Sequence, residues 1–217
     1  IHNNELVVDY KGIYSIEKFI IARKLMYWQV YLHKTVLSAE HTLMNILKRA
    51  KQLVLEDKKI YSTPSFKPFL YERRKINDQL FKRKNLLHPF SLIDDYDIFN
   101  CMKNWIHEDD KVLQILSESI INRKLLKIES INIEDLEHRL KKLRSFTMEK
   151  FKINDRDVKY LVFPISISND TYNFNNSEIK FFKKDNILIN LSEITTEFNI
   201  NTENSKIIKH YICFPKN

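Results

Sequence analysis

The sequence is poor in glycine, in cysteine and in long apolar runs. Gly12 is the single glycine among 217 residues, whereas an average chain of this length carries roughly 15. Phosphate-binding loops of the Walker A and dinucleotide-binding types each require several glycines, so the sequence excludes both. No apolar run approaches the roughly 20 residues of a membrane-spanning helix, and we expect no membrane as a partner.

Two cysteines, Cys101 and Cys213, lie far apart and form no CxxC pair. We expect both to be free, buried thiols in a reducing cytoplasm. The chain is rich in positive charge instead, with 36 Lys and Arg against 28 Asp and Glu and a net charge of +8. A surface of this sign favours anionic partners, either nucleotides or nucleic acid.

Hydrophobic periodicity predicts an α+β chain whose first part is mainly helical. Residues 16–55 contain no Gly or Pro and predict one long helix or two joined helices, which Ser15 would cap. Asp94 or Asp95 would cap a helix ending near residue 106, and a further helix is expected over residues 110–122. We predict a helical region over residues 1–122.

The remaining residues, 123–217, predict a small α/β subdomain. Their expected order is strand, helix, strand, strand, helix, strand, which is that of a ferredoxin-like unit. The expected strands cover residues 124–129, 160–168, 179–189 (a strand or hairpin) and 207–214, and the expected helices cover residues 133–151 and 191–198.

Positive side chains fall on an apolar face of the first long helix. At 100° per residue, Arg23 and Lys34 share one arc with Tyr27 and Tyr31, and His33 lies beside it. A cation in apolar surroundings is costly unless it is paired, either with a carboxylate of the protein or with an anionic ligand. An internal salt bridge with ordinary helix packing is therefore the alternative to a phosphate site. The same arc holds six apolar residues: Ile16, Phe19, Ile20, Met26, Val30 and Leu37.

A second basic pair follows the helix expected at 110–122. If that helix continues, Arg123 and Lys127 lie one turn apart and extend its apolar stripe. Alone, this pattern is also typical of ordinary amphipathic packing.

The segments GIYSIEKF (12–19) and ARKLMYWQVYLHK (22–34) resemble bacterial HD-domain phosphohydrolases, relatives of the vertebrate SAM-and-HD-domain dNTP triphosphohydrolase. That family has an Arg and then a Tyr-x-His-Lys motif at this spacing. The segment NRKLLK (122–127) resembles its Arg-x-x-x-Lys element, and HYICFPK (210–216) resembles the terminal strand of the bacterial branch. The similarity spans nearly the whole chain.

The resemblance implies a role for each matched residue. Arg23 would contact substrate phosphate and Tyr31 the sugar and base. Tyr27 stands where the vertebrate relative has a His that assists catalysis, so an acid role does not carry over. His33, Lys34, Arg123 and Lys127 would contact a regulatory nucleotide.

The resemblance also implies that the chain completes an HD domain of a metal-dependent enzyme that hydrolyses (deoxy)nucleoside triphosphates. The family's metal ligands, a His, a His-Asp pair and a distant Asp, lie upstream of the matched helix. This chain has no His-Asp dipeptide, so we expect the divalent metal to bind outside it and expect no catalytic metal ligand within it. Such a chain would supply phosphate contacts and oligomerisation elements, would be inactive alone, and would form a cytoplasmic dimer or tetramer.

Two other functions remain open. A degenerate HD protein would regulate without turnover. A non-catalytic basic module would bind nucleotides or nucleic acid, and its cations would be Arg73, Arg74, Lys82, Arg83, Lys84, Lys141 and Lys142.

Overall fold

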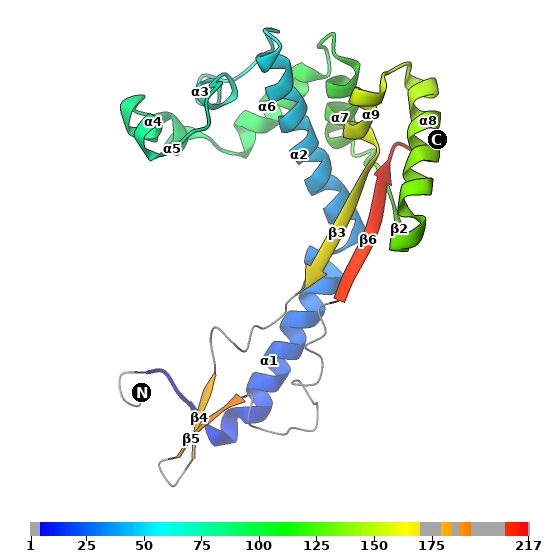
Figure 1. Ribbon diagram of the computed structural model, residues 1–217. Helices are drawn as coiled ribbons and strands as arrows, with labels where there is room; N and C mark the ends of the chain where they lie inside the picture. The colour runs from blue at the N-terminus through cyan, green and yellow to red at the C-terminus, as the bar shows by residue number, and fades with distance from the viewer. Residues whose placement is uncertain (1–4, 170–178, 184–186, 192–206, 217) are drawn as a thin grey trace. The chain divides into compact units, whose positions relative to one another are not determined.

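The computed structural model describes residues 5–169, 179–183, 187–191 and 207–216 (Figure 1). The chain forms two compact units. The first unit contains Ile1–His33 and Ser166–Lys209, and the second contains Lys34–Ile165 and His210–Asn217. The boundary predicted at residue 122 falls inside the second unit, because the helix before it and the strand after it both pack against the same long helix.

The first unit packs one helix against a small sheet. Strands β1 and β4 pair in parallel, and β4 and β5 pair antiparallel. Gly12 allows a close approach here, since a Cβ atom at this position would lie 2.9 Å from Cγ1 of Val8. The elements are β1 (Val8–Asp9), η1 (Tyr10–Gly12), α1 (Ile13–Met26), η2 (Tyr27–Tyr31), β4 (Lys180–Phe182) and β5 (Leu188–Asn190). Their apolar core consists of Ile13, Ile20, Phe181 and Leu191.

The long helix predicted over residues 16–55 is two joined helices. The first, α1, begins at Ile13 with Gly12 as its N-cap, so the prediction that Ser15 caps it is wrong. It passes into the π-helix η2, where the amide of Leu32 donates to the carbonyl of Tyr27 at 2.7 Å. The second helix, α2 (Lys34–Leu55), starts the second unit.

The second unit is built mainly from helices packed on α2. Its core forms where α2 meets α7 and where α7 meets α6 and α9. Leu53, Trp105 and Leu113 are fully buried there. Its remaining helices are α3 (Lys67–Leu70), α4 (Asp78–Arg83), α5 (Leu87–Leu92), α6 (Asp95–Trp105), α7 (Lys111–Ile121), η3 (Ile133–Asp135), α8 (Leu136–Phe151) and α9 (Asp155–Leu161).

Side-chain caps fix the starts of α6 and α7. Asp94 accepts from the amide of Asp97, whose carboxylate in turn accepts from the amide of Asp94, which forms a capping box. Asp110 accepts from the amide of Leu113 at 2.8 Å. The predicted helices ending near residues 106 and 122 are confirmed.

The larger sheet has the strand order β2-β6-β3, with β2 and β6 antiparallel and Lys127 opposite Phe214. These strands are β2 (Lys127–Ile131), β3 (Phe163–Asn169) and β6 (Ile207–Phe214), so the predicted last strand is confirmed. Residues 160–161 belong to α9, and β3 starts later than predicted.

The α+β class is confirmed, but the ferredoxin-like order is wrong for the described strands. A ferredoxin-like unit places its four strands in one sheet. Here β4 and β5 pair with β1 from the start of the chain, while β2, β6 and β3 form a separate sheet. The helix predicted at residues 191–198 lies almost entirely outside the described residues. In the described part, every helix is too short or too polar to cross a bilayer.

Candidate functional site

The end of α1 and the π-helix η2 bring together Arg23, Tyr27 and Tyr31. Nη2 of Arg23 donates to the hydroxyl of Tyr27 at 3.2 Å, and its guanidinium carbon lies 5.2 Å from the centroid of the Tyr27 ring. The rings of Tyr27 and Tyr31 are 5.3 Å apart at 47°. These contacts hold one guanidinium and two phenols as a cluster on the surface of the first unit.

The π-helix is a feature that the sequence did not predict. It covers Tyr27–Tyr31 and so contains two of the three clustered residues. A single π turn inside a helix is rare and occurs often at functional sites. Helical periodicity carries no signal for it, because one wide turn shifts the pattern by only one residue.

The face that carries Arg23 is exposed rather than part of the core. Phe19, Met26 and Val30 are 61%, 50% and 53% exposed. Of the six apolar residues on the predicted arc, Ile20 packs against the sheet, together with Ile13, while these three face outward. In the part of the chain that the structure describes, neither Arg23 nor Lys34 forms an ion pair with a carboxylate. The internal salt bridge considered from sequence is therefore not found there.

The helix α1 also carries a buried carboxylate. Glu17 is fully buried between Ile13 and Ile20 along the helix, and neither of its oxygens has a hydrogen-bond partner among the described residues. An unpartnered buried carboxylate is costly.

The second unit holds Lys34 and Lys127 on neighbouring elements. Lys34 begins α2, and its Nζ lies 5.9 Å from the centroid of the Tyr211 ring. Lys127 begins β2, and its Nζ lies 5.5 Å from the Phe214 ring. Both rings belong to β6. The hydroxyl of Ser38 donates to the carbonyl of residue 126 at 2.8 Å and ties α2 to the start of β2.

Arg123 does not continue a helix. The helix α7 ends at Ile121, and Arg123 adopts a left-handed backbone with φ of 55°. A spacing of one helical turn between Arg123 and Lys127 required that helix to continue, and it does not, because Lys127 is in a strand. Arg123 is an exposed turn residue, and His33 is exposed at the end of the first unit.

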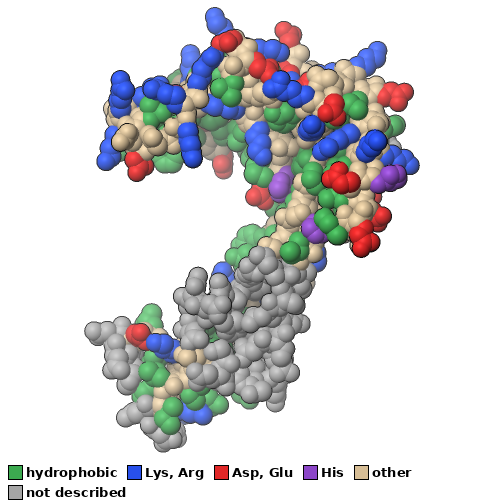
Figure 2. All heavy atoms as spheres, viewed as in Figure 1, with side chains coloured by type: hydrophobic (Ala, Val, Ile, Leu, Met, Phe, Trp, Pro, Cys, Tyr) green, Lys and Arg blue, Asp and Glu red, His purple; other side chains and the backbone are tan. Residues whose placement is uncertain are grey.

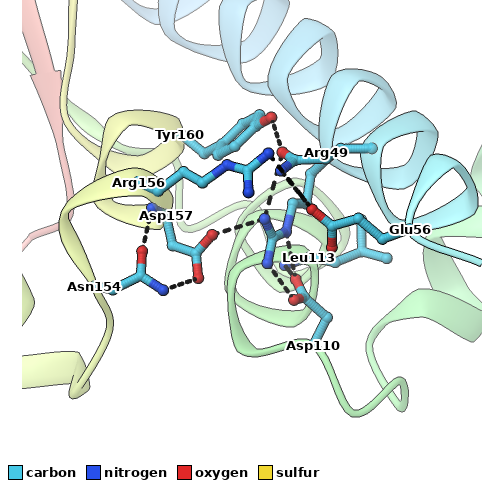
Figure 3. Close-up of polar contacts among 9 residues, drawn as sticks. Arg49, Glu56, Asp110, Leu113, Asn154, Arg156, Asp157 and Tyr160 are labelled. Atoms are coloured by element: carbon cyan, nitrogen blue, oxygen red, sulfur yellow. Dashed lines mark hydrogen bonds and ion pairs between the residues drawn. The ribbon is translucent and has the colours of Figure 1, made fainter. Parts of the chain in front are cut away.

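A buried ionic cluster that the sequence did not reveal lies among α2, α7 and α9 (Figure 3). Arg49 is 5% exposed and binds both oxygens of Asp110, at 3.0 and 2.6 Å, and one oxygen of Asp157 at 2.7 Å. Its guanidinium lies 5.5 Å from the centroid of the Tyr160 ring.

The cluster is satisfied internally. Burial opposes the charged form of Arg49, but hydrogen bonds and charges from the two aspartates outweigh it and raise the pKa of Arg49. Burial likewise opposes the charge of Asp110, yet the hydrogen bond from Arg49 lowers the pKa of that carboxyl. Because each charge already has its partner, this cluster holds the fold and leaves no group for a ligand.

The described residues do not suit a metal ion. They contain no group of three His, Cys, Asp or Glu side chains that could hold one. Asp94 and Asp97 serve as helix caps. An open pocket of about 410 Å³ lies between β2 and α8, but it contains none of the predicted site residues.

A family model matches the first part of the chain. Residues 1–65 match the HD associated region. Over its whole length the chain resembles the crystal structure of a phosphohydrolase from Bacteroides thetaiotaomicron, with 35% identity and a TM-score of 0.87, and it covers 53% of that protein. These matches support the relation to HD-superfamily phosphohydrolases that the sequence predicts.

Two curated relatives match less of the chain, at lower sequence identity. The uncharacterized protein YwfO of Bacillus subtilis is 32% identical over 59% of this chain, which covers 28% of YwfO. The uncharacterized protein MG461 of Mycoplasma genitalium is 28% identical over 88% of this chain, which covers 44% of MG461. A hypothetical protein from Aquifex aeolicus shares the fold alone, with 19% identity and a TM-score of 0.52 over 99% of the chain and 45% of that protein. The chain thus spans about half the length of these relatives or less.

Proposed function

We propose that this chain supplies the phosphate-binding side chains of an HD-type phosphohydrolase that hydrolyses nucleoside triphosphates, in particular dNTPs. The observation that carries the proposal is the exposed guanidinium of Arg23, held by Tyr27 and not neutralised by a carboxylate within the described residues. A planar guanidinium binds phosphate oxygens through two parallel hydrogen bonds. The neighbouring ring of Tyr31 offers a flat surface to a sugar or base.

The two units would contact different nucleotides. In this proposal Arg23, Tyr27 and Tyr31 of the first unit contact the substrate. Lys34, Arg123 and Lys127 of the second unit contact the phosphates of a second, regulatory nucleotide, a role that the resemblance also gives to His33. The adjoining positions of α2 and β2 support the shared role of the two lysines.

The chemistry of hydrolysis would be divided between this chain and the rest of the enzyme. Arg23 would neutralise charge on the triphosphate and orient it, which favours a transition state with more negative charge on the leaving group. A divalent metal, when bound, would activate water for attack on the α-phosphate. The resemblance puts the family's metal ligands upstream of the matched helix, so we propose that they lie outside this chain.

The exposed apolar stripe on α1 and η2 supports a missing neighbour. Phe19, Met26 and Val30 expose large apolar surfaces beside Arg23, and proteins rarely leave such patches uncovered. The relatives extend well beyond the region that this chain matches. We propose that the HD half of the enzyme covers this stripe and thereby forms one side of the nucleotide site. The enzyme would be a cytoplasmic dimer or tetramer.

Turnover by the full-length protein tests this function. We expect dNTPs to be cleaved to the deoxynucleoside and inorganic triphosphate in the presence of a divalent metal. Arg23→Ala should lower kcat/KM by about 100-fold, a loss typical of one charged transition-state contact, and Arg23→Lys should recover part of it. Lys18→Ala removes an exposed cation from the same helix and should leave turnover unchanged.

Equal activity of the Arg23→Ala and Lys18→Ala variants would contradict the assignment. Binding without turnover, with the same dependence on Arg23, would instead indicate a regulatory HD protein.

The basic nucleic-acid module is the less favoured function. Arg74 and Lys84 both pair with the buried carboxylate of Glu72, and Arg73 pairs with Asp57. These ion pairs occupy three of the seven cations that such a module would use. A module of this kind should lose affinity steeply with salt, whereas a nucleotide site should saturate with single dNTPs.

A further inference from the structure

The π-helix η2 carries Tyr27 and Tyr31, two of the three residues of the proposed substrate site. The amide of Leu32 reaches back to the carbonyl of Tyr27, which makes a wider turn than that of an α-helix. None of the residues of η2 is buried, so packing in a core does not hold the turn. Because such turns are rare, we expect a contact from outside the helix to stabilise this one.

A contact of this kind reaches η2 from the strand β6. Nζ of Lys209 in β6 lies 3.8 Å from the centroid of the Trp28 ring in η2, and both residues belong to the first unit. In the described part of the chain, the other distances between a cation and a ring run from 4.6 to 5.9 Å, so this contact is the closest of its kind there. Tryptophan is also the side chain whose ring attracts a cation most strongly.

No carboxylate of the described residues competes with Trp28 for the charge of Lys209. Figure 2 shows many Lys and Arg side chains over the helices of the second unit, so an exposed cation alone indicates no role. Lys209 is exposed as well, but its ammonium is held against a ring. Its backbone is already ordered in a strand, so the contact costs mainly the entropy of one side chain.

Trp28 links this contact to the substrate site, because it follows Tyr27 directly and lies in the same π turn as Tyr31. Tyr27 accepts from Arg23 at 3.2 Å, and the rings of Tyr27 and Tyr31 are 5.3 Å apart. A shift of Trp28 would therefore displace the whole cluster. We propose that Lys209 is a positioning residue of the substrate site, which holds Trp28 and, through it, the π turn that presents the two tyrosines. This role rests on the proposed function, in which Tyr31 meets the sugar or base.

Calorimetric titration of the full-length protein tests this role, with each common deoxynucleoside and its triphosphate as ligands and without turnover. Lys209→Met should weaken binding of the deoxynucleoside and of the triphosphate by the same factor, since a positioning residue does not touch the phosphates. We expect a factor of about two to five, which is the range for one exposed contact between a cation and a ring. Lys209→Arg should bind both ligands as the wild type does, because a guanidinium also binds the face of a ring.

A second variant and a matched control isolate the contact. In a Trp28→Leu background, Lys209→Met should cost nothing further, because the ring that it contacts is already gone. The control is Lys183→Met. Nζ of Lys183 lies 4.6 Å from the Tyr10 ring, and Tyr10 precedes α1 whereas η2 follows it. This variant loses a contact of the same kind at the other end of α1 and should bind both ligands as the wild type does.

Binding by Lys209→Met that equals binding by the wild type overturns the proposal. So does a loss that is larger for the triphosphate, which would indicate that Lys209 contacts phosphate directly. A loss that Lys209→Arg does not reverse, or that persists in full in the Trp28→Leu background, also overturns it. If Arg23→Ala weakens triphosphate binding and Lys209→Met does not, the positioning role alone fails, whereas the proposed function fails too if neither variant has an effect.

Discussion

Removal of the Arg49 guanidinium should destabilise the second unit more than any change of an exposed charge. Arg49→Ala leaves Asp110 and Asp157 as partly buried carboxylates, 10% and 18% exposed, without the buried cation whose contacts now measure 2.6 to 3.0 Å. Breaking a buried ion pair in this way typically costs about 3–5 kcal/mol. With a dependence of about 2 kcal/mol per molar urea, the midpoint of unfolding should fall by roughly 2 M.

Fluorescence of Trp105 reports this unfolding directly. Trp105 is fully buried in the second unit, and its indole donates to the carbonyl of Tyr61 at 2.8 Å. The only other tryptophan is Trp28, so a Trp28→Phe background isolates the signal. Arg156→Ala is the matched control, because Arg156 is 75% exposed and lies 3.7 Å from Glu56. Such a surface pair contributes about 0–1 kcal/mol.

A midpoint for Arg49→Ala that equals the midpoint for Arg156→Ala would refute this reasoning. A second comparison checks the cause of the loss. Arg49→Met combined with Asp110→Asn and Asp157→Asn removes the orphaned charges as well, and should recover part of the stability. No recovery would indicate that lost packing, and not unpaired charge, dominates.

Three further predictions follow from single groups. Hydrogen bonds, first from Lys84 and then from Arg74, lower the pKa of Glu72 to about 2. The stability that its charge provides is complete above its ordinary pKa of 4.5 and is lost as pH falls toward 2. The free energy of unfolding should therefore depend less on pH in that range in Glu72→Gln than in the wild type. Burial raises the pKa of the thiols of Cys101 and Cys213, that of Cys213 to about 12. A thiol reagent at pH 8 should therefore label the native protein slowly and the urea-unfolded protein at once, and fast labelling of the native protein would contradict the buried placement. Asp94→Ala should cost about 1 kcal/mol in urea unfolding through loss of the capping box, and no loss would show that α6 starts without it.

Local signals in the sequence predicted the elements that depend on a few neighbouring residues. The helices α6 and α7 begin where acidic caps precede apolar periodicity, and β6 has the bounds expected from its run of β-forming residues. Arg23, Tyr27 and Tyr31 share one arc of a helix in the sequence and lie together in the structure.

Features that depend on distant parts of the chain could not be predicted. The pairing of β4 with β1 joins residues about 170 positions apart, and no local pattern encodes such a partner. The sequence of α1 offers apolar residues on more than one face, so the choice of Ile13 and Ile20 for the core depends on the sheet beside them. For the same reason Arg49 looks like an ordinary helical cation in the sequence. Only the fold brings Asp110 and Asp157 beside it.

The central claim is that Arg23 receives nucleotide phosphate, and calorimetric titration of the full-length protein tests it most directly. The ligands are one deoxynucleoside and its mono-, di- and triphosphate, each measured without turnover on the wild type and on Arg23→Ala. We predict that affinity rises with phosphate number in the wild type and that Arg23→Ala weakens binding of the phosphorylated ligands while leaving binding of the deoxynucleoside unchanged. An equal loss for all four ligands, or no loss for any, would contradict it.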